Sequence, residues 1–572
     1  MKEEIRKFFK GEIEDNEETL LKYSHDASLL EVRPKLVVFP MNSIDVQNLV
    51  KWVSENKEKY PELSITARCA GTDMSGGALG ESIIMDFTRY MNKLIRGPQP
   101  LRNFSGSKNF SPVPSQITVQ PGMFYRDFEK ITLEKGLILP CYTASKSLNA
   151  MGGMYGNNAA GERTLKYGKT EDYILETKVV FADGVERVVK PIPLSEIAGA
   201  GEIYAKTYEL IKNNEEEIKL AKPRVHKNSA GYYLWNIMGQ RSKNPSQLET
   251  VFDLNKLLVG SQGTLGIATE ITFKLIPENK YSKLVVIFLN DIEPLGRLVD
   301  EILTLNPETL EAYDDKTMKL AVKFFPDFLR HKGFFGMFKF MWSFFPEFKM
   351  MLTHGFPRLI LLAEFAGENN SDVEGKCRKL TERIKNFGLK MHITRNQAEA
   401  DKYWDIRRES FALLRKHVQG KHTAPFIDDI IVRPEFLPKF IPELNNILSH
   451  YKMTYTIAGH AGDGNFHIIP LMDFSRPDTG KIIMELSAKV YDLVLRYHGS
   501  ITAEHNDGII RTPYLRQMYG ERITSIFSEV KKIFDPKNIF NPGKKVSGPG
   551  ALGTKEYIIS HIAIEHHAVH KV

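Results

Sequence analysis

The sequence is poor in cysteine and has no long apolar run. Three cysteines in 572 residues, Cys69, Cys141 and Cys377, are too few and too scattered for a disulfide framework, a zinc finger or a cysteine-ligated iron–sulfur cluster. No stretch of 18 uncharged apolar residues occurs, so we expect no transmembrane helix. The N-terminus, MKEEIRKFFKGEIEDNEE, lacks an apolar segment and resembles neither a secretory signal nor a transit peptide. These absences predict a cytoplasmic protein.

Net charge, composition and length exclude several further classes of protein. Lys and Arg number 77 against 70 Asp and Glu, and a net charge of +7 is too dilute over this length to indicate nucleic-acid binding. Apolar residues make up 42% and charged residues 26%, which excludes a disordered or collagen-like chain. At roughly 150 residues per domain, the length predicts two to four domains and makes a single small binding module improbable.

The pattern of short β-branched runs and helical stretches predicts an α+β protein. In the first third, apolar runs at 36–40, 63–68, 82–87 and 116–122 alternate with a helix from about 43 to 58. After Pro277, apolar runs at 283–289 and 359–365 indicate an antiparallel sheet. We therefore predict domains at 1–280 and 281–450, a C-terminal segment at 451–545 and a tail at 546–572.

The segment 321–358 is the compositional outlier. It contains eleven Phe, one Trp and four Met, and its six Lys or Arg against two acids give a local charge of +4. Apolar side chains recur at helical spacing from Phe334 to Phe345, a stretch too short to span a bilayer, and Pro346 is expected to end or kink that helix. A membrane-surface segment is the favoured reading, because six positive charges make full burial expensive, and a buried hairpin or an oligomer interface is the alternative.

Two glycine-rich loops could hold phosphate groups. The loops are ARCAGTDMSGGALG (67–80) and MGGMYGNNAAGERTLKYG (151–168), whose small residues let backbone amides approach phosphate oxygens. Neither fits the GxGxxG fingerprint of one βαβ unit, because the first loop runs into another strand, and no Walker loop is present. A dinucleotide held by both loops is consistent with these features.

Histidines and a glutamate recur in two C-terminal motifs. GHAGDGNFH places His460 and His467 on either side of a glycine turn, and SITAEHND contains Glu504 and His505. Imidazole and carboxylate ligands together suit zinc, manganese or iron(II), although spacing alone leaves a chance arrangement open. On the helix predicted around 403–410, Arg407 would seek a carboxylate if it were buried, but the residues alone favour an exposed, solvated face.

Seven motifs in this order resemble the flavoprotein superfamily of vanillyl-alcohol oxidase and para-cresol methylhydroxylase. The resemblance is to its branch of D-lactate dehydrogenases, glycolate oxidase flavoprotein subunits and D-2-hydroxyglutarate dehydrogenases, and it runs from about Tyr23 to Lys545. The motifs are AGTDMSGG, QPGMFYRDFEK, MGGMYGNNAAG with KYGKTEDYI, LLVGSQGTLGIATEITFKL, GHAGDGNFH, TAEHNDG and FDPKNIFNPGK.

This resemblance implies a two-subdomain FAD-binding domain, an antiparallel-sheet substrate domain and a C-terminal segment that returns to the flavin. The first loop contains no histidine that could link the cofactor covalently, so dissociable FAD is expected. The residues implied to contact FAD are Gly71, Thr72, Asp73, Ser75, Gly76, Gly152, Gly153, Asn157, Gly161, Gly266, Ile267 and Asn541.

The resemblance also implies a chemistry. His460, His467 and Glu504 would bind the divalent metal, His505 would be the general base, and Arg407 would hold the substrate carboxylate. The metal would lower the pKa of the 2-hydroxyl group, His505 would take its proton, and hydride would pass from C2 to flavin N5. The implied substrate is a small D-2-hydroxy acid, D-lactate first, and the product is a 2-oxo acid.

The sequence departs from the resemblance at two positions. Gln262 stands where relatives commonly have Glu, and Asn506 stands where they often have Gly, beside the implied base. The cysteine count leads us to expect no iron–sulfur domain like the one fused to some relatives, so electrons are expected to leave by another route. Quinone at an anionic membrane surface, reached through 324–351 on the inner face of the membrane, is the expected partner.

Other functions stay open at this point. The same fold could oxidise glycolate or 2-hydroxyglutarate, act as a flavin oxidase, or catalyse redox-neutral chemistry as in the ether-lipid synthase branch. A non-catalytic, membrane-binding flavoprotein subunit is the alternative from another class. The sequence also leaves a homodimer open.

Overall fold

The computed structural model describes residues 1–101, 113–244, 247–323, 357–417, 421–451, 453–548 and 550–563. The predicted membrane segment 324–351 lies outside these residues. So do the last nine residues of the predicted tail, whereas its beginning contains α21 (Lys555–Ser560). Within the described residues, no helix is both long enough and apolar enough to cross a membrane.

The chain begins with a small sheet whose strands are mainly parallel. Its order is β1-β2-β4-β3, with β2, β4 and β3 parallel and β1 antiparallel to β2. The amide groups of Ile44 and Asp45 donate to the side chain of Asn42, which caps helix α3 and fixes its start. The elements are α1 (Lys2–Ile5), β1 (Glu12–Glu14), α2 (Glu17–Tyr23), β2 (Leu36–Phe39), α3 (Ser43–Asn56), β3 (Ile65–Arg68) and β4 (Ile83–Asp86).

A second, antiparallel sheet completes the first domain. Its order is β5-β6-β13-β8-β9, β7 adds to β13, and a three-stranded sheet β10-β12-β11 lies beside it. The strands are β5 (Leu94–Pro100), β6 (Ser115–Val119), β7 (Leu137–Ile138), β8 (Ile174–Val180), β9 (Glu186–Val189), β10 (Ile192–Pro193), β11 (Met238–Asn244), β12 (Gln247–Phe252) and β13 (Ile267–Pro277). The helices are α4 (Tyr125–Leu133), α5 (Met151–Asn157), α6 (Thr164–Tyr167), α7 (Glu202–Asn213), α8 (Glu215–Ala221) and α9 (Asn255–Leu258). Together the sheets form the two α+β subdomains that the sequence predicts.

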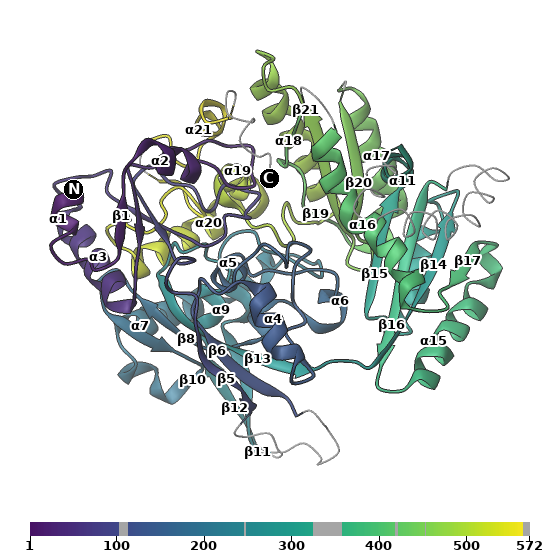
Figure 1. Cartoon of the computed structure of the whole chain (residues 1–572), viewed down its shortest axis with the longest axis horizontal. Coiled ribbons are helices and arrows are strands. Elements are labelled where there is room, and N and C mark those ends of the chain that lie inside the picture. The colour runs from purple at the N-terminus through teal and green to yellow at the C-terminus, as the bar shows by residue number, and fades with distance from the viewer. Residues whose placement is uncertain are drawn as a thin grey trace.

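An eight-stranded antiparallel sheet forms the second domain, which occupies the right half of Figure 1. Along β14, Val285 and Ile287 face the core beneath α10 and α15, whereas Leu284 and Val286 face α11 and α16, as expected from the two-residue period of a strand. The strands are β14 (Tyr281–Leu289), β15 (Thr309–Asp314), β16 (Leu359–Gly367), β17 (Lys390–Ile393), β18 (His422–Thr423), β19 (Ile430–Ile431), β20 (Thr454–His460) and β21 (Asn465–Met472). The helices are α10 (Leu295–Leu303), α11 (Asp315–Lys323), α15 (Asn370–Arg383), α16 (Gln397–His417), α17 (Leu437–Ser449) and α18 (Thr479–Arg496).

The boundary expected at residue 450 falls inside this sheet. Strands β20 and β21 follow that residue, yet β20 pairs with β15 through Ala312 and Gly459. The apolar pattern identifies β20 as a strand but says nothing about its partner, and Ala312, which lies 147 residues before Gly459 in the chain, gives no local signal. The sheet therefore joins segments that the sequence suggests are separate.

The C-terminal chain returns to the first domain, as predicted. Helices α19 (Gly508–Arg511) and α20 (Leu515–Phe534) lie with α21 on that side of the molecule (Figure 1). Helix α20 packs on α7 and α8, and the amide of Ile65 in β3 donates to the carbonyl of Ile539 at 2.7 Å. This return brings residues 504–545 against the glycine-rich loops.

Candidate active site

A cavity in the first domain is lined by three segments, 67–78, 150–157 and 258–268. The first segment leaves β3, the second forms α5, and the third enters β13. The two glycine-rich loops therefore meet on one hollow. Eight of the twelve residues expected to contact FAD line it: Gly71, Thr72, Asp73, Gly152, Gly153, Asn157, Gly266 and Ile267.

Backbone rather than side chain forms much of this lining. Gly71 adopts a φ of +66°, which favours glycine, and a Cβ on Gly153 would meet no atom within 4 Å. In the described part of the chain, the backbone amides of Gly71 and Thr72 have no protein acceptor. Free amides beside a cavity suit the oxygens of a pyrophosphate. The lining formed by 67–78, 150–157 and 258–268, here called the flavin cradle, therefore fits FAD.

Asp73 organises the first loop from within. Its Oδ1 accepts from the amides of Ser75 and Gly77 at 2.6 and 3.0 Å, and from the Ser75 hydroxyl at 2.7 Å. Its Oδ2 accepts from the side-chain amide of Asn157 at 2.8 Å. Ser75 and Gly76 are not among the residues that line the cavity, and Ser75 thus supports the shape of the loop.

Gly161 and Asn541 also lie apart from the cavity lining. The amide of Asn541 donates to the carbonyls of Gly77 and Gln262 at 2.8 and 2.7 Å, and its Oδ1 accepts from the Thr66 hydroxyl at 3.0 Å. Asn541 is fully buried and joins two cofactor loops. Its expected contact with the flavin stays a prediction, and so does that of Gly161.

The three expected metal ligands converge in the second domain. His460 ends β20 and His467 lies in β21, so the hairpin brings the two imidazoles together. The Nε2 atoms of His460 and His467 lie 2.8 and 3.2 Å from the same oxygen, Oε1 of Glu504. Two ring nitrogens and a carboxylate directed at one point form a donor set suited to zinc, manganese or iron(II).

Neighbouring groups orient both imidazoles. The Nδ1 of His460 donates to Glu311 at 2.5 Å, and the Nδ1 of His467 donates to the carbonyl of Asp428 at 3.0 Å. Each bond leaves Nε2 as the free ligand atom, a common arrangement around bound metals. Burial by itself would lower the pKa of His460, but the carboxylate of Glu311 raises it to about 9. The pKa of His467 is lowered, chiefly by burial.

The buried charges around these ligands favour a divalent cation. Three carboxylates have a cationic partner, in the pairs Glu311–Arg407, Asp428–Arg511 and Asp463–Lys227. With the histidines counted as neutral, Glu504 and Asp429 leave two negative charges, and Lys227 is 3.7 Å from Glu504. A divalent metal would balance this charge while the imidazoles stay neutral; without one, protonation of His460 and His505, whose pKa values are raised, balances it.

His505 is held beside this group by Asp428. Its Nδ1 donates to Asp428 Oδ2 at 2.7 Å, and its ring stacks on that of His467 at 4.9 Å. Asp428 also pairs with the fully buried guanidinium of Arg511. Burial lowers the pKa of His505, but the carboxylates of Asp428 and Asp429 raise it to about 10, so the ring is protonated at neutral pH unless a cation binds nearby.

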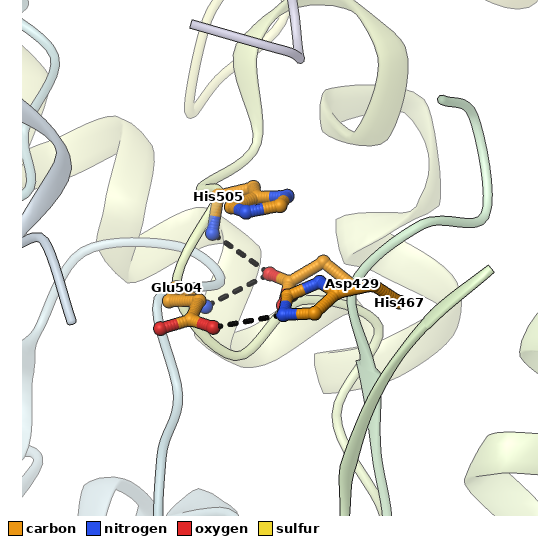
Figure 2. Close-up of side chains that lie close together, drawn as sticks. All are labelled: Asp429, His467, Glu504 and His505. Carbon is orange, nitrogen blue, oxygen red and sulfur yellow. Dashed lines mark hydrogen bonds and ion pairs between the residues drawn. The ribbon is translucent and has the colours of Figure 1, made fainter. Parts of the chain in front are cut away.

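A second grouping shares part of this donor set. Ligand atoms of Asp429, His467, Glu504 and His505 lie within 4.8 Å of one another (Figure 2). Asp429 Oδ2, however, accepts from the Thr502 hydroxyl and from the amides of Ala503, Glu504 and His505, at 2.6 to 2.8 Å. We infer that Asp429 braces the ligand-bearing loop, because Oδ2 accepts these four hydrogen bonds and Oδ1 accepts one from the Asn465 side chain at 3.0 Å.

Arg407 lies close to the ligands but has a protein partner. Its Nη2 is 3.0 Å from Oε2 of Glu311, the same carboxylate that holds His460. Its side chain is only 7% exposed, so the exposed face that the residues alone favour is wrong for this arginine. Its role as a clamp for a substrate carboxylate stays a prediction.

Sequence reasoning missed the carboxylates and the lysine that support the ligands. These residues are Lys227, Glu311, Asp428, Asp429 and Asp463. The run FIDDII (426–431) did carry a signal, because two adjacent acids inside an apolar stretch are rarely buried without a purpose. Glu311 and Lys227 had no comparable local signal.

The two departures from the resemblance meet in one hydrogen-bonded network. Gln262 and Asn506 have φ values of +53° and +67°, in the left-handed region that favours glycine. Gln262 Nε2 donates to Asp73 at 3.2 Å, which a glutamate carboxylate could not do. Both residues therefore contribute to the junction between the loops.

Fold and site together define a two-domain FAD-linked oxidoreductase. The family "FAD binding domain" matches residues 34–189, and "FAD linked oxidases, C-terminal domain" matches 278–545. The chain belongs to the FAD-binding flavoprotein family of vanillyl-alcohol oxidase and para-cresol methylhydroxylase.

Curated relatives resemble the chain over most of its length. It is 25% identical to D-2-hydroxyglutarate dehydrogenase of Pseudomonas putida over 94% of this chain and 50% of that protein. It is also 25% identical to glycolate oxidase subunit GlcD of Bacillus subtilis, over 93% of each chain, and to D-lactate dehydrogenase of Anaerostipes hadrus, over 91% of this chain and 92% of that protein. The chain thus spans about half the length of the 2-hydroxyglutarate enzymes it matches.

A solved structure of p-cresol methylhydroxylase with substrate bound has the same fold. The match has a TM-score of 0.64 and 16% identity, over 94% of each chain. At this identity the likeness concerns the fold alone.

Proposed function

We propose that the protein is a dehydrogenase that oxidises a D-2-hydroxy acid, with D-lactate as the first candidate, to the 2-oxo acid. The observation that carries the proposal is the convergence of His460 Nε2 and His467 Nε2 on Glu504, beside a histidine oriented by a carboxylate. Relatives named for 2-hydroxyglutarate, glycolate and D-lactate support the substrate class and leave the particular acid open.

The residues present divide the work between binding and proton transfer. Arg407 would bind the substrate carboxylate, since guanidinium matches it bidentately and the side chain lies beside the ligand group. His505 would take the hydroxyl proton at Nε2, because its Nδ1 is committed to Asp428. When bound, FAD supplies the acceptor for the hydride from C2, and a divalent cation held by His460, His467 and Glu504 supplies a Lewis acid.

The test is an anaerobic visible spectrum of the purified, metal-replete protein. It is titrated in turn with D-lactate, L-lactate, glycolate and D-2-hydroxyglutarate. Bleaching of the flavin band by one D-acid supports the proposal and identifies the substrate. A bound flavin that none of the acids bleaches favours redox-neutral chemistry or a non-catalytic subunit, and a protein that binds no flavin contradicts the whole assignment.

For the electron acceptor we propose a quinone at an anionic membrane surface. Support comes from the composition of 324–351, which is rich in Phe and basic residues. Co-sedimentation with vesicles of anionic lipid, compared with a variant lacking 324–351, tests this. Equal sedimentation of the two proteins contradicts it.

A further inference from the structure

Asn506 occupies a special place in the chain, directly after Glu504 and His505. It is fully buried, and its φ of +67° is one that asparagine tolerates better than most residues. Its amide donates to the Ser229 hydroxyl at 3.1 Å, and its carbonyl accepts from Arg511 Nη1 at 2.9 Å. The backbone on both sides of its side chain is therefore fixed.

The side chain of Asn506 connects the ligand-bearing loop with the flavin cradle. Its Nδ2 donates to the carbonyl of Gly260 at 2.9 Å and to the carbonyl of Asn157 at 3.2 Å. Asn157 lines the cavity, and Gly260 lies between the lining residues Leu258 and Ser261. One amide thus holds two walls of the cradle.

Gln262 makes a second connection at the same junction. Its Oε1 accepts from the amide of Gly508 at 2.9 Å. Its Nε2 lies 3.2 Å from both Asp73 Oδ2 and Asn157 Oδ1. Residues 506–508 are therefore joined to all three segments that line the cavity.

We propose that Asn506 is a positioning residue that couples the flavin cradle to the metal-binding group. Its amide holds Glu504 and His505 at a fixed place relative to Asn157 and Gly260. A cofactor that orders the cradle then also orders the ligands, so bound FAD tightens metal binding, and bound metal tightens FAD binding by the same factor. The inference rests on the FAD and metal sites of the proposed function, but it needs no turnover.

The test compares wild type with Asn506→Gly. Glycine adopts a φ of +67° without strain and removes only the side-chain amide. Mn²⁺ affinity is measured by calorimetry on flavin-loaded and flavin-stripped protein. We expect FAD to tighten Mn²⁺ binding about tenfold in wild type and less than about threefold in the variant.

Asn306→Gly is the matched control, because Asn306 is exposed, lies outside the site and has a φ of +52°. In this control, the ratio of Mn²⁺ affinities between flavin-loaded and flavin-stripped protein should equal that of wild type. If Asn506→Gly does not fold, Gln262→Met provides the second variant, since methionine has a similar length and forms none of the hydrogen bonds of the Gln262 side chain. Its ratio should also fall.

Two results would overturn the proposal: equal Mn²⁺ affinities in loaded and stripped wild type, or a wild-type ratio in folded Asn506→Gly (in Gln262→Met, if Asn506→Gly does not fold). Coupling without oxidation of any 2-hydroxy acid would contradict only the proposed function. Oxidation without coupling would contradict only the role of Asn506.

Discussion

The two halves of the candidate site are built by opposite means. The flavin cradle is made mostly of backbone, from three short glycine-containing segments at 67–78, 150–157 and 258–268. The metal-binding group is made of charged side chains, five of them carboxylates, brought together from segments between 227 and 511. The cradle recognises its ligand by shape and free amides, whereas the ligand group does so by buried charge.

This difference determines how each half tolerates change. A buried charge without its partner is costly, so a single substitution in the ligand group should have a large effect. A methyl group added to the cradle should act only through the space it fills. The following predictions test that contrast.

The largest effect is expected for Glu504→Gln. The substitution removes the negative charge of the carboxylate on which both imidazoles converge, while the similar size of glutamine preserves packing. We expect turnover to fall at least about a thousandfold, the equivalent of about 4 kcal/mol of lost transition-state stabilisation. Turnover and Mn²⁺ affinity are measured together, and Glu374→Gln, beside Lys283 in the second domain, is the control for the same exchange.

An Asp429→Ala variant should lose stability before anything else. It leaves one hydroxyl and three backbone amides of residues 502–505 without their acceptor, which we expect to lower the free energy of unfolding by about 3 to 5 kcal/mol. Asp429→Asn keeps an acceptor oxygen and should lose only about 1 to 2 kcal/mol. Chemical denaturation measures both.

Asp429→Asn also tests whether Asp429 supports the loop 502–505 or binds the metal directly. If Asp429 braces the loop, Asp429→Asn should bind Mn²⁺ within about tenfold of wild type. Complete loss of Mn²⁺ binding in this stably folded variant would instead make Asp429 a ligand.

How far the sequence predicts each half follows from the same contrast. The flavin cradle can be recognised from short stretches of sequence, because the glycines of loops 67–80 and 151–168 are clustered within each loop. Eight of the twelve residues expected to contact FAD line the cavity. The metal-binding group, by contrast, is assembled from residues far apart in the sequence. Its histidines and Glu504 follow from motifs, but Glu311 reaches His460 only because β15 pairs with β20, and strand pairing has no local signature. The same limitation explains the misplaced boundary at residue 450.

A carboxyl group at the domain interface tests the effect of buried charge outside the ligand group. Burial raises the pKa of Glu364 to about 7, with Glu308 and Glu162 adding to the rise and Arg163 opposing it. The folded protein therefore binds this proton more tightly than the unfolded chain does. Stability should fall as pH rises from about 4.5 to about 7, by at most about 3 kcal/mol.

Glu364→Gln removes this titration, because glutamine stays neutral. Denaturation midpoints measured between pH 5 and 8 should decline less steeply in the variant than in wild type, and the variant should be the more stable protein above pH 7. Parallel curves would mean that Glu364 does not carry the effect.

The smallest effect is expected in the cradle, where adjacent glycines of α5 offer a matched pair. A Cβ on Gly153 meets no protein atom within 4 Å, so Gly153→Ala should fold at least as well as wild type and weaken FAD binding about tenfold, by occupying space meant for the cofactor. A Cβ on Gly152 lies 2.6 Å from Pro121, so Gly152→Ala should destabilise the protein itself by about 1 to 3 kcal/mol. Thermal unfolding with and without FAD distinguishes the two. Wild-type FAD affinity in Gly153→Ala would mean that the cofactor does not lie over α5, and the division between a backbone cradle and a charged ligand group would then need a different boundary.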